Sequence, residues 1–237
     1  MRIHKRWRWV GVFSPELMLC VGDAGVGPIP RRWWAVAFPD GTMREGSRGV
    51  RLSPERVEVD GVIDVRLDEE PGVEIRSITP RGNSIWTRKQ GGIHARGRVT
   101  VDGRTHELDA RAVVDDSAGH HDRHTAWHWS AGVGVADDAT PVAWNLVAGI
   151  HDTPGASERR VWRDGSPTEV DPVEFAPDLS RVGSLSFTPW CERVDDTNLL
   201  VFRSHYRQPF GSFSGTLPDG TVLREGYGVM EEHDVLW

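Results

Sequence analysis

Ionisable and aromatic side chains are concentrated between residues 115 and 129. If a strand begins at residue 123, alternation places four side chains on one face, which we take as the inward face: Arg123, Thr125, Trp127 and Trp129. A buried arginine needs a carboxylate partner, because an unpaired buried cation costs several kcal/mol. Asp115 and Asp116 are the obvious nearby partners. Two interpretations stay open: a structural clasp between Arg123 and Asp115 that closes one end of a barrel, or a pair that orients a ligand.

The same segment holds four histidines, and their residue type invites comparison with a zinc or iron site. They are His120, His121, His124 and His128, with His151 and Asp152 further along the chain. The spacing does not support a metal site, because adjacent histidines point to opposite sides of a strand. We therefore expect no metal and no cofactor, and we interpret these histidines as exposed loop residues.

Three other segments contribute polar side chains to the candidate ligand site. Lys89 is one of only two lysines in a chain with 28 basic residues, so it is less easily explained as a solvated charge, and an interior and an exposed position both stay open. Asn145 lies within a strand-like apolar run and is able to donate to a ligand carbonyl. Tyr206 and Gln208 share one face of a later strand.

Glu231 and Asp115 are the candidate acids. Glu231 and Glu232 are adjacent, so only one of them faces inward, and Glu231 shares its face with Val229. A carboxyl group in a tryptophan-lined pocket loses hydration, which raises its pKa and keeps it protonated near neutral pH. Such a group is able to donate a proton to a bound molecule.

The elements that must position these residues are short β-strands. Helical periodicity is absent from the sequence, whereas β-rich runs recur about every ten residues between Gly, Pro and Asp-Gly breaks. The Asp-Gly pairs that begin at residues 40, 60, 102, 164 and 219 predict hairpins with type I′ turns. The chain is predicted to be all-β, an antiparallel meander forming two packed barrels. The segment 111–124 reads as an inter-domain passage or an active-site loop, with domains at 1–113 and 114–237.

Composition limits the classes of function. The chain has 237 residues, 38% hydrophobic and 27% charged, which is typical of a globular protein rather than a disordered one. No apolar run is long enough for a membrane span, and no signal-peptide core is seen, so we expect a cytoplasmic protein. A net charge of -7 argues against nucleic acid as a partner. Eleven tryptophans indicate large-volume cores or an aromatic-lined cavity.

Several motifs resemble a bacterial family known as domain of unknown function 2804. They are Asp115-x3-Gly119-x5-Thr125-x-Trp127-x-Trp129, Trp144-Asn145-Leu146, Glu158 followed by Trp162-x-Asp164-Gly165, and the C-terminal stretch ending in GYGVMEEHDVLW. Lys89 resembles the central lysine of the family, and Glu158 enters the candidate site on this resemblance. The family is similar, more distantly, to AttH-like and carotenoid-hydratase-like proteins. This implies a calycin fold of two lipocalin-type barrels and an apolar ligand, without supplying a reaction.

Three functions remain open at this point. The first is a lyase or isomerase that hydrates or cyclises a hydrophobic small molecule, with Asp115 or Glu231 as the acid. The second is a non-catalytic carrier of such a molecule. The third is a barrel whose polar interior is structural. We predict a cavity lined by Trp127 and Trp129 and reached by polar groups of Asp115, Arg123, Asn145, Tyr206 and Glu231; the oligomeric state stays open.

Overall fold

The computed structural model describes residues 3–153, 155–198 and 202–237, and within them every regular element is a β-strand. Part of the strand expected over 198–206 lies outside the described residues. The strands are β1 (Lys5–Phe13), β2 (Met18–Val26), β3 (Ile29–Ala37), β4 (Met43–Gly46), β5 (Val50–Leu52), β6 (Arg56–Val59), β7 (Ile63–Leu67), β8 (Val73–Ile78), β9 (Ser84–Val101), β10 (Arg104–Gly119), β11 (His124–Ala136), β12 (Pro141–Ala148), β13 (Arg160–Arg163), β14 (Ser166–Glu169), β15 (Arg181–Val182), β16 (Ser184–Asn198), β17 (Arg203–Thr216) and β18 (Val222–Leu236). The described residues contain no helix that could span a membrane.

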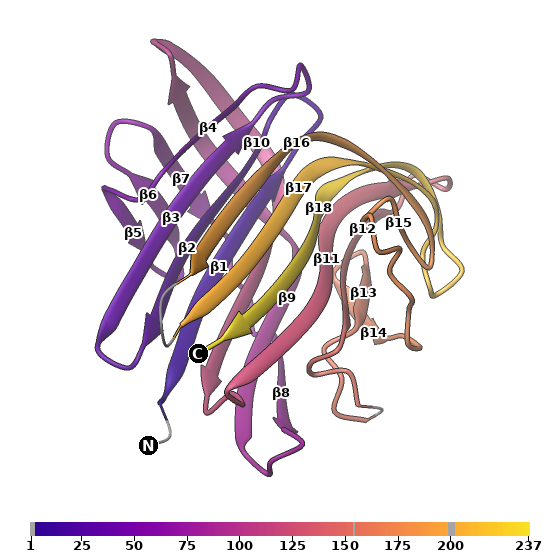
Figure 1. The fold of residues 1–237 in the computed structure, drawn as a ribbon. Helices are drawn as coiled ribbons and strands as arrows, with labels where there is room; N and C mark the ends of the chain where they lie inside the picture. Colours follow the sequence, from indigo (N-terminus) through magenta and orange to yellow (C-terminus); the bar gives the residue numbers. More distant parts are fainter. Residues whose placement is uncertain (1–2, 154, 199–201) are drawn as a thin grey trace.

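The strands form two antiparallel sheets with related topology (Figure 1). The first sheet has the order β4-β3-β2-β1-β10-β9-β7-β6-β5, with β8 added to β9. The second has the order β14-β13-β12-β11-β18-β17-β16-β15. In each sheet the first strand in the chain pairs with a long, late strand, β1 with β10 and β11 with β18. This arrangement confirms the all-β antiparallel prediction.

The passage between the sheets is shorter than the sequence suggested. β10 continues without a break through residues 113 and 114 to Gly119, and β11 begins at His124. The loop expected over 111–124 is therefore wrong for residues 111–119, because Ala112 and Val114 turn their side chains into the first core and extend the strand. The division into domains 1–113 and 114–237 stays a prediction, with its boundary inside β10.

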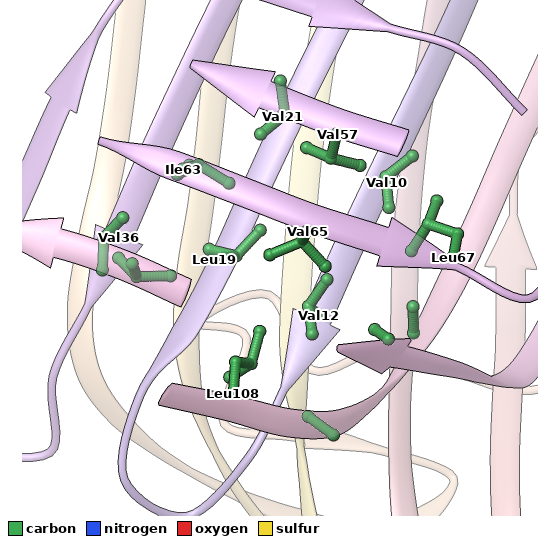
Figure 2. Close-up of a cluster of buried hydrophobic side chains, with 14 of the residues drawn as sticks. Val10, Val12, Leu19, Val21, Val36, Val57, Ile63, Val65, Leu67 and Leu108 are labelled. Carbon is green, nitrogen blue, oxygen red and sulfur yellow. The ribbon is translucent and has the colours of Figure 1, made fainter. Parts of the chain in front are cut away.

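Three apolar clusters show how the sheets are stacked. One cluster is built only from strands of the first sheet, and Figure 2 shows its valines, leucines and isoleucine packed together. Another lies within the second sheet and the segment before β16. The third, which we call the central cluster, combines residues of both sheets, including Trp9 and Cys20 from the first and Trp129 and Val229 from the second. Each sheet therefore covers its own core with one face and contacts the other sheet with the opposite face.

Two of the five Asp-Gly pairs form the predicted turn. Asp102 with Gly103 and Asp164 with Gly165 have positive φ at both residues and join adjacent strands through two-residue loops. At the other three pairs only the glycine has a positive φ, and the connections are longer. The type I′ prediction is therefore right at two sites and wrong at three, where the longer connections do not require positive φ at both residues.

Five tryptophan side chains lie directly against glycines. At each of these glycines an added methyl group would overlap the indole ring. The pairs are Trp9 with Gly11, Trp33 with Gly22, Trp34 with Gly46, Trp144 with Gly132, and Trp162 with Gly91. The last pair joins β13 of the second sheet to β9 of the first. Many of the tryptophans thus fill the space above glycines, where the backbone carries no side chain.

Candidate functional site between the two sheets

The tryptophan face of β11 points toward the first sheet and not into a barrel. Trp129 is 4% exposed, and its ring meets that of Trp9 edge-on with centroids 4.9 Å apart. The opposite face of β11 carries Ser130 and Gly132, and Trp144 of β12 fills the space above them. Because these small residues face the second core, the large indoles are directed to the contact between the sheets. The expected inward orientation is therefore corrected to an inter-sheet one.

A buried lysine with two carboxylates forms the first charged centre, which we call the Lys89 centre. The Lys89 Nζ atom pairs with Asp115 and lies 3.0 Å from the Glu158 carboxylate. The Lys89 and Glu158 side chains are almost wholly buried, and that of Asp115 nearly so. Lys89 and Asp115 are direct neighbours on β9 and β10, while Glu158 comes from the segment before β13. The ion pairs thus join the two sheets.

A bulge determines which aspartate meets Lys89. The β9–β10 pairing shifts by one residue between Ala112 and Val113, where Gly92 is left unpaired with a φ of 77°. A glycine tolerates this conformation without steric cost. Without the bulge, residue 89 would lie opposite Asp116 on the other face of β10. With it, Lys89 lies opposite Asp115 and both face the second sheet.

The charges of the Lys89 centre stabilise one another. Burial opposes ionisation of Lys89, but the two carboxylates outweigh it and raise the lysine pKa. Burial likewise opposes ionisation of Glu158, and Lys89 together with His151 lowers its pKa below the usual value. Asp115 differs, because burial and the charge of Glu158 outweigh Lys89 and raise its pKa to about 6. At neutral pH the centre therefore holds one ammonium and two mainly ionised carboxylates.

Buried histidines surround the Lys89 centre on one side. The His151 Nδ1 atom is 2.6 Å from the Ser77 hydroxyl, and its Nε2 atom is 4.0 Å from Glu158 Oε1. The rings of His121 and His151 meet edge-on at 5.8 Å. Burial lowers the pKa of His121 to about 2, so the ring is neutral. The interpretation of the histidines as exposed loop residues is thus wrong for His121 and His151, which are 6% and 7% exposed because their rings pack against each other and, for His121, against Trp7.

A carboxyl group with neutral neighbours forms the second centre, which we call the Glu231 centre. The Trp127 indole donates to Glu231 Oε1 at 2.9 Å, and the Gln208 amide donates to Oε2 at 2.9 Å. Tyr206 lies beside them on β17 and is buried, as are Gln208 and Glu231. Alternation along β18 correctly places Glu231 inside and leaves Glu232 half-buried.

The Glu231 centre keeps its carboxyl group close to half protonated at neutral pH. Burial raises the pKa of Glu231 to about 7 and outweighs the hydrogen bonds that oppose it, and the charge of Asp115 adds a smaller increase. Burial also raises the Tyr206 pKa far above its usual value, so the phenol is neutral. No cation is paired with Glu231 in the described part of the chain.

Asn145 links the two centres. Its side-chain oxygen accepts a hydrogen bond of 2.8 Å from the Trp129 indole, and its amide nitrogen donates to the Glu158 backbone carbonyl at 3.1 Å. Trp129 in turn lies directly across from Glu231 on β18. The asparagine is fully buried, so its amide is satisfied by protein groups.

Arg123 and Thr125 do not join the site. Arg123 is exposed, and in the described residues Asp115 pairs with Lys89 instead of with Arg123, so the predicted clasp is wrong. The reason is position: Arg123 precedes β11 at the outer end of the sheet, whereas Asp115 lies in the middle of the contact. The Thr125 hydroxyl donates to the Asp122 carbonyl at 3.1 Å and is half-buried at the same outer end.

The remaining histidines that were compared with a metal site are scattered. His124 is exposed and pairs with Asp234 at 2.9 Å, and His128 stacks on Phe175. Over residues 3–153, 155–198 and 202–237, no three His, Cys, Asp or Glu side chains converge in a metal-binding arrangement.

Two surface pockets are found at the edges of the sheets. One lies between β3 and β4 of the first sheet and β16 of the second, and the other lies near the ends of β16, β17 and β18. Neither is lined by Trp127 or Trp129, so the cavity expected there stays a prediction. Of the residues expected to reach it, Asp115, Asn145, Tyr206 and Glu231 do lie between the sheets.

Sequence reasoning missed several buried side chains of the inter-sheet contact. Trp9, Trp33 and Arg193 belong to it, and none stood out from its local surroundings. One signal was available: each sheet begins with a Trp-x-Trp pattern, Trp7 to Trp9 in β1 and Trp127 to Trp129 in β11. The second tryptophan of each pattern meets its counterpart across the contact.

Comparisons with known proteins support the fold. Residues 35–237 match the family described as domain of unknown function 2804. A candidate AttH protein from Nitrosomonas europaea is similar in structure, with a TM-score of 0.50 and 13% identity over 96% of this chain and 91% of that one. Kievitone hydratase from Nectria haematococca has a TM-score of 0.49 and 11% identity, over 98% and 88%. No curated protein sequence matches significantly. The likeness to the AttH protein supports the predicted antiparallel two-barrel fold and shows the fold alone.

Proposed function

The chain belongs to the family of domain of unknown function 2804, and from its own geometry we propose that it binds a small apolar molecule between the two sheets and transfers a proton to it. The observation that carries this proposal is Glu231, whose buried carboxyl group has a pKa of about 7 and only uncharged hydrogen-bond donors. A carboxyl group with this pKa exists in both forms at neutral pH, which suits a general acid.

The two centres differ in the way that acid and base pairs differ in enzymes. Asp115 is held mainly as a carboxylate by Lys89, and Glu231 is held partly as the acid by burial. Pairs of carboxyl groups with separated pKa values commonly divide the roles of base and acid. We assign Glu231 as the proton donor and Asp115 as the acceptor.

These roles fit addition or rearrangement at a carbon–carbon double bond. Glu231 would give its proton to one alkene carbon, leaving a cationic centre on the other, which the indoles of Trp127 and Trp129 stabilise through their π-faces. In a hydration, water then bonds to the cationic carbon and loses a proton to Asp115. In an isomerisation, Asp115 removes a proton from the neighbouring carbon instead. Both reactions need no oxidant, and they correspond to a lyase or an isomerase.

A carrier of an apolar ligand is the alternative, because the same indoles would bind a ligand without reacting with it. Lys89, Asn145, Glu158, Tyr206 and Gln208 would orient the polar part of the ligand in either case. The partner in both proposals is a hydrophobic small molecule.

Ligand binding is measured first on the unmodified protein, and one pair of variants then distinguishes binding from catalysis. Native mass spectrometry of the purified protein identifies any co-purified apolar compound, and tryptophan fluorescence measures saturable quenching by isoprenoid alcohols, fatty acids and polyketides. Binding of the native state also raises the melting temperature. We expect Glu231→Gln to keep binding within about twofold and to lower turnover by about a hundredfold or more, the range of general acid catalysis. The matched control is Glu232→Gln, on the other face of β18.

The outcomes divide the alternatives. Binding without turnover in the unmodified protein indicates a carrier. Turnover that survives Glu231→Gln contradicts the assignment of the acid. A complete lack of binding across the panel, with no co-purified compound, contradicts both functions and leaves a structural role for the polar residues.

A further inference from the structure

The pocket between the two sheets opens onto a buried arginine. It has a volume of about 840 Å³ and lies between β3 and β4 on one side and β16 on the other. Figure 1 shows β16 passing beside the strands of the first sheet. Trp33 of β3 and Arg193 of β16 line it on the faces that also build the central cluster. The pocket is therefore an outer opening of the same inter-sheet contact that holds the Glu231 centre.

Arg193 lies at the inner end of this pocket. Its side chain is 11% exposed, and its guanidinium carbon lies 5.8 Å from the Trp33 ring centroid and 5.3 Å from that of Tyr206. The guanidinium group is thus held between two aromatic rings, an arrangement that favours a desolvated cation. Tyr206 is also the neighbour of Glu231, so Arg193 connects the pocket to the proposed acid.

The carboxylates around Arg193 do not use all of its donors. Arg193 Nη2 is 3.2 Å from Asp195, but the same carboxylate already accepts two bonds from Arg31, at 2.8 and 2.7 Å. Arg193 Nε is 3.2 Å from Glu45, whose side chain is 47% exposed, so this pair is weak. The contact to Glu45 is not a hydrogen bond, so Arg193 Nε is buried without a hydrogen-bond partner among the described residues.

A second donor beside Arg193 also lacks an acceptor. The Trp33 Nε1 atom is buried, and none of the described residues accepts its hydrogen. A buried donor without an acceptor is costly, so native proteins seldom leave one unless water or a ligand completes it. Arg193 Nε and Trp33 Nε1 are thus two buried N–H donors without acceptors, one of them on a cation, and both belong to residues that line one pocket.

We propose that this pocket binds an organic oxyanion, a carboxylate or sulfonate on an apolar body, with Arg193 and Trp33 donating to its oxygens. The proposal deepens the proposed function and rests on it, because it names the class of ligand that enters between the sheets. The face of Trp33 and the exposed side chain of Val194 supply apolar surface in the pocket for the ligand body. A headgroup bound at Arg193 places the rest of the molecule beside Tyr206 and toward Glu231.

Two probes that share a naphthyl body and differ in the headgroup test the proposal: the carboxylate 2-naphthoate and the neutral alcohol 2-naphthalenemethanol, each titrated into the full chain by calorimetry. We expect naphthoate to bind about tenfold or more tighter than the alcohol, because hydrogen bonds to a charged group are the strong ones. Arg193→Met should remove this difference while keeping the affinity for the alcohol. Arg66→Met, an exposed arginine on β7, is the matched control and should change neither affinity.

Two further measurements keep the test decisive. Trp33→Phe removes only the indole donor and should weaken naphthoate by a few fold. If Arg193→Met does not fold, as judged by its melting curve, Arg193→Lys keeps the charge but loses the planar fork, and it should lower naphthoate affinity without lowering that of the alcohol.

The failure of this inference is distinct from the failure of the proposed function. Equal affinities for the two probes, unchanged by Arg193→Met, overturn the oxyanion site and leave the binding of apolar molecules supported. Binding of the alcohol but not of naphthoate does the same. Binding of neither probe at millimolar concentration overturns the oxyanion site, while the Glu231 experiment still tests the proposed function with its own ligands.

Discussion

The Lys89 and Glu231 centres are both buried between the same two sheets, yet the pKa of Glu158 is lowered in the first and the pKa of Glu231 is raised in the second. Burial alone favours the neutral acid in each centre. Next to Lys89 the carboxyl groups of Asp115 and Glu158 are mainly ionised at neutral pH. Next to Trp127 and Gln208, the carboxyl group of Glu231 is kept near half protonation. The comparison of Glu158 with Glu231 teaches that a neighbouring cation is able to reverse the effect of burial on the pKa of a carboxyl group.

The two centres differ in charge because different strands supply their side chains. The Lys89 centre is assembled across the β9–β10 hairpin, whose bulge brings a cation opposite an anion. The Glu231 centre is assembled on β11, β17 and β18, where the neighbouring side chains that face the first sheet are uncharged. Asn145 connects the two centres without bringing charge to either.

Removing the cation should have the largest effect. Lys89→Met leaves two carboxylates close together without a counter-charge, and we expect it to lower the free energy of unfolding by about 3 to 5 kcal/mol at pH 7. Urea denaturation measures this loss. Arg44→Met, which breaks the exposed pair with Asp102, is the control and should cost less than about 1 kcal/mol.

A rescue variant tests the cause of that loss. Replacing both partners by amides as well, in Lys89→Met with Asp115→Asn and Glu158→Gln, should restore much of the stability, because no buried charge is left unpaired. If the triple variant is no more stable than the single one, the loss comes from packing and the comparison between the centres breaks.

The Glu231 centre should reveal itself in the pH dependence of stability. The folded pKa of about 7 lies above the ordinary value of 4.5, so the folded chain binds this proton more tightly than the unfolded chain. The resulting stabilisation is complete below about pH 4.5 and is lost as the pH rises to 7, a change of about 3 kcal/mol. We expect Glu231→Gln to remove this contribution, as seen in urea denaturation between pH 5 and 8.

The control for the pH experiment is Glu232→Gln, which should keep the pH dependence of the unmodified chain. Asp115 also has a raised pKa, so the quantity to compare is the difference between variants at each pH. An unchanged pH slope in Glu231→Gln would show that Glu231 is ionised throughout, like its counterparts beside Lys89.

The smallest effect is expected at Arg123. Because Arg123 is exposed and Asp115 pairs with Lys89, Arg123→Ala should change the free energy of unfolding by less than about 0.5 kcal/mol. Chemical denaturation at neutral pH measures it. A loss of several kcal/mol would instead indicate that Arg123 pairs with Asp115, and that Lys89 is not the sole cation of its centre.

Alternation within a strand was the most reliable guide from the sequence. It separates Glu231 from Glu232 and places Lys89 on the same buried face as Thr87. It also groups Trp127 with Trp129, and Tyr206 with Gln208. These statements depend only on the two-residue period of a strand, which the sequence contains.

Pairing between strands was less predictable. The partner of Asp115 depends on the register of β9 and β10, and counting back from the Asp102-Gly103 turn would place Lys89 opposite Asp116. The bulge at Gly92 shifts this register by one residue. A glycine in a strand is not sufficient evidence to predict a bulge from the sequence. Similarly, the face of β11 that meets the other sheet depends on where Trp144 packs, which is a property of the assembled fold.

The five tryptophans that lie against glycines limit how the sequence of this protein is able to change during evolution. At each pair, adding a side chain at the glycine overlaps an indole, whereas shrinking the tryptophan leaves bare backbone facing an empty space. A substitution of either the glycine or the tryptophan alone is therefore destabilising, so we expect the two residues to be replaced together during evolution. Across the family, the residues at positions 162 and 91 should consequently vary together. Their joint variation would preserve the contact between the two sheets, while the other residues of β9 and β13 vary independently.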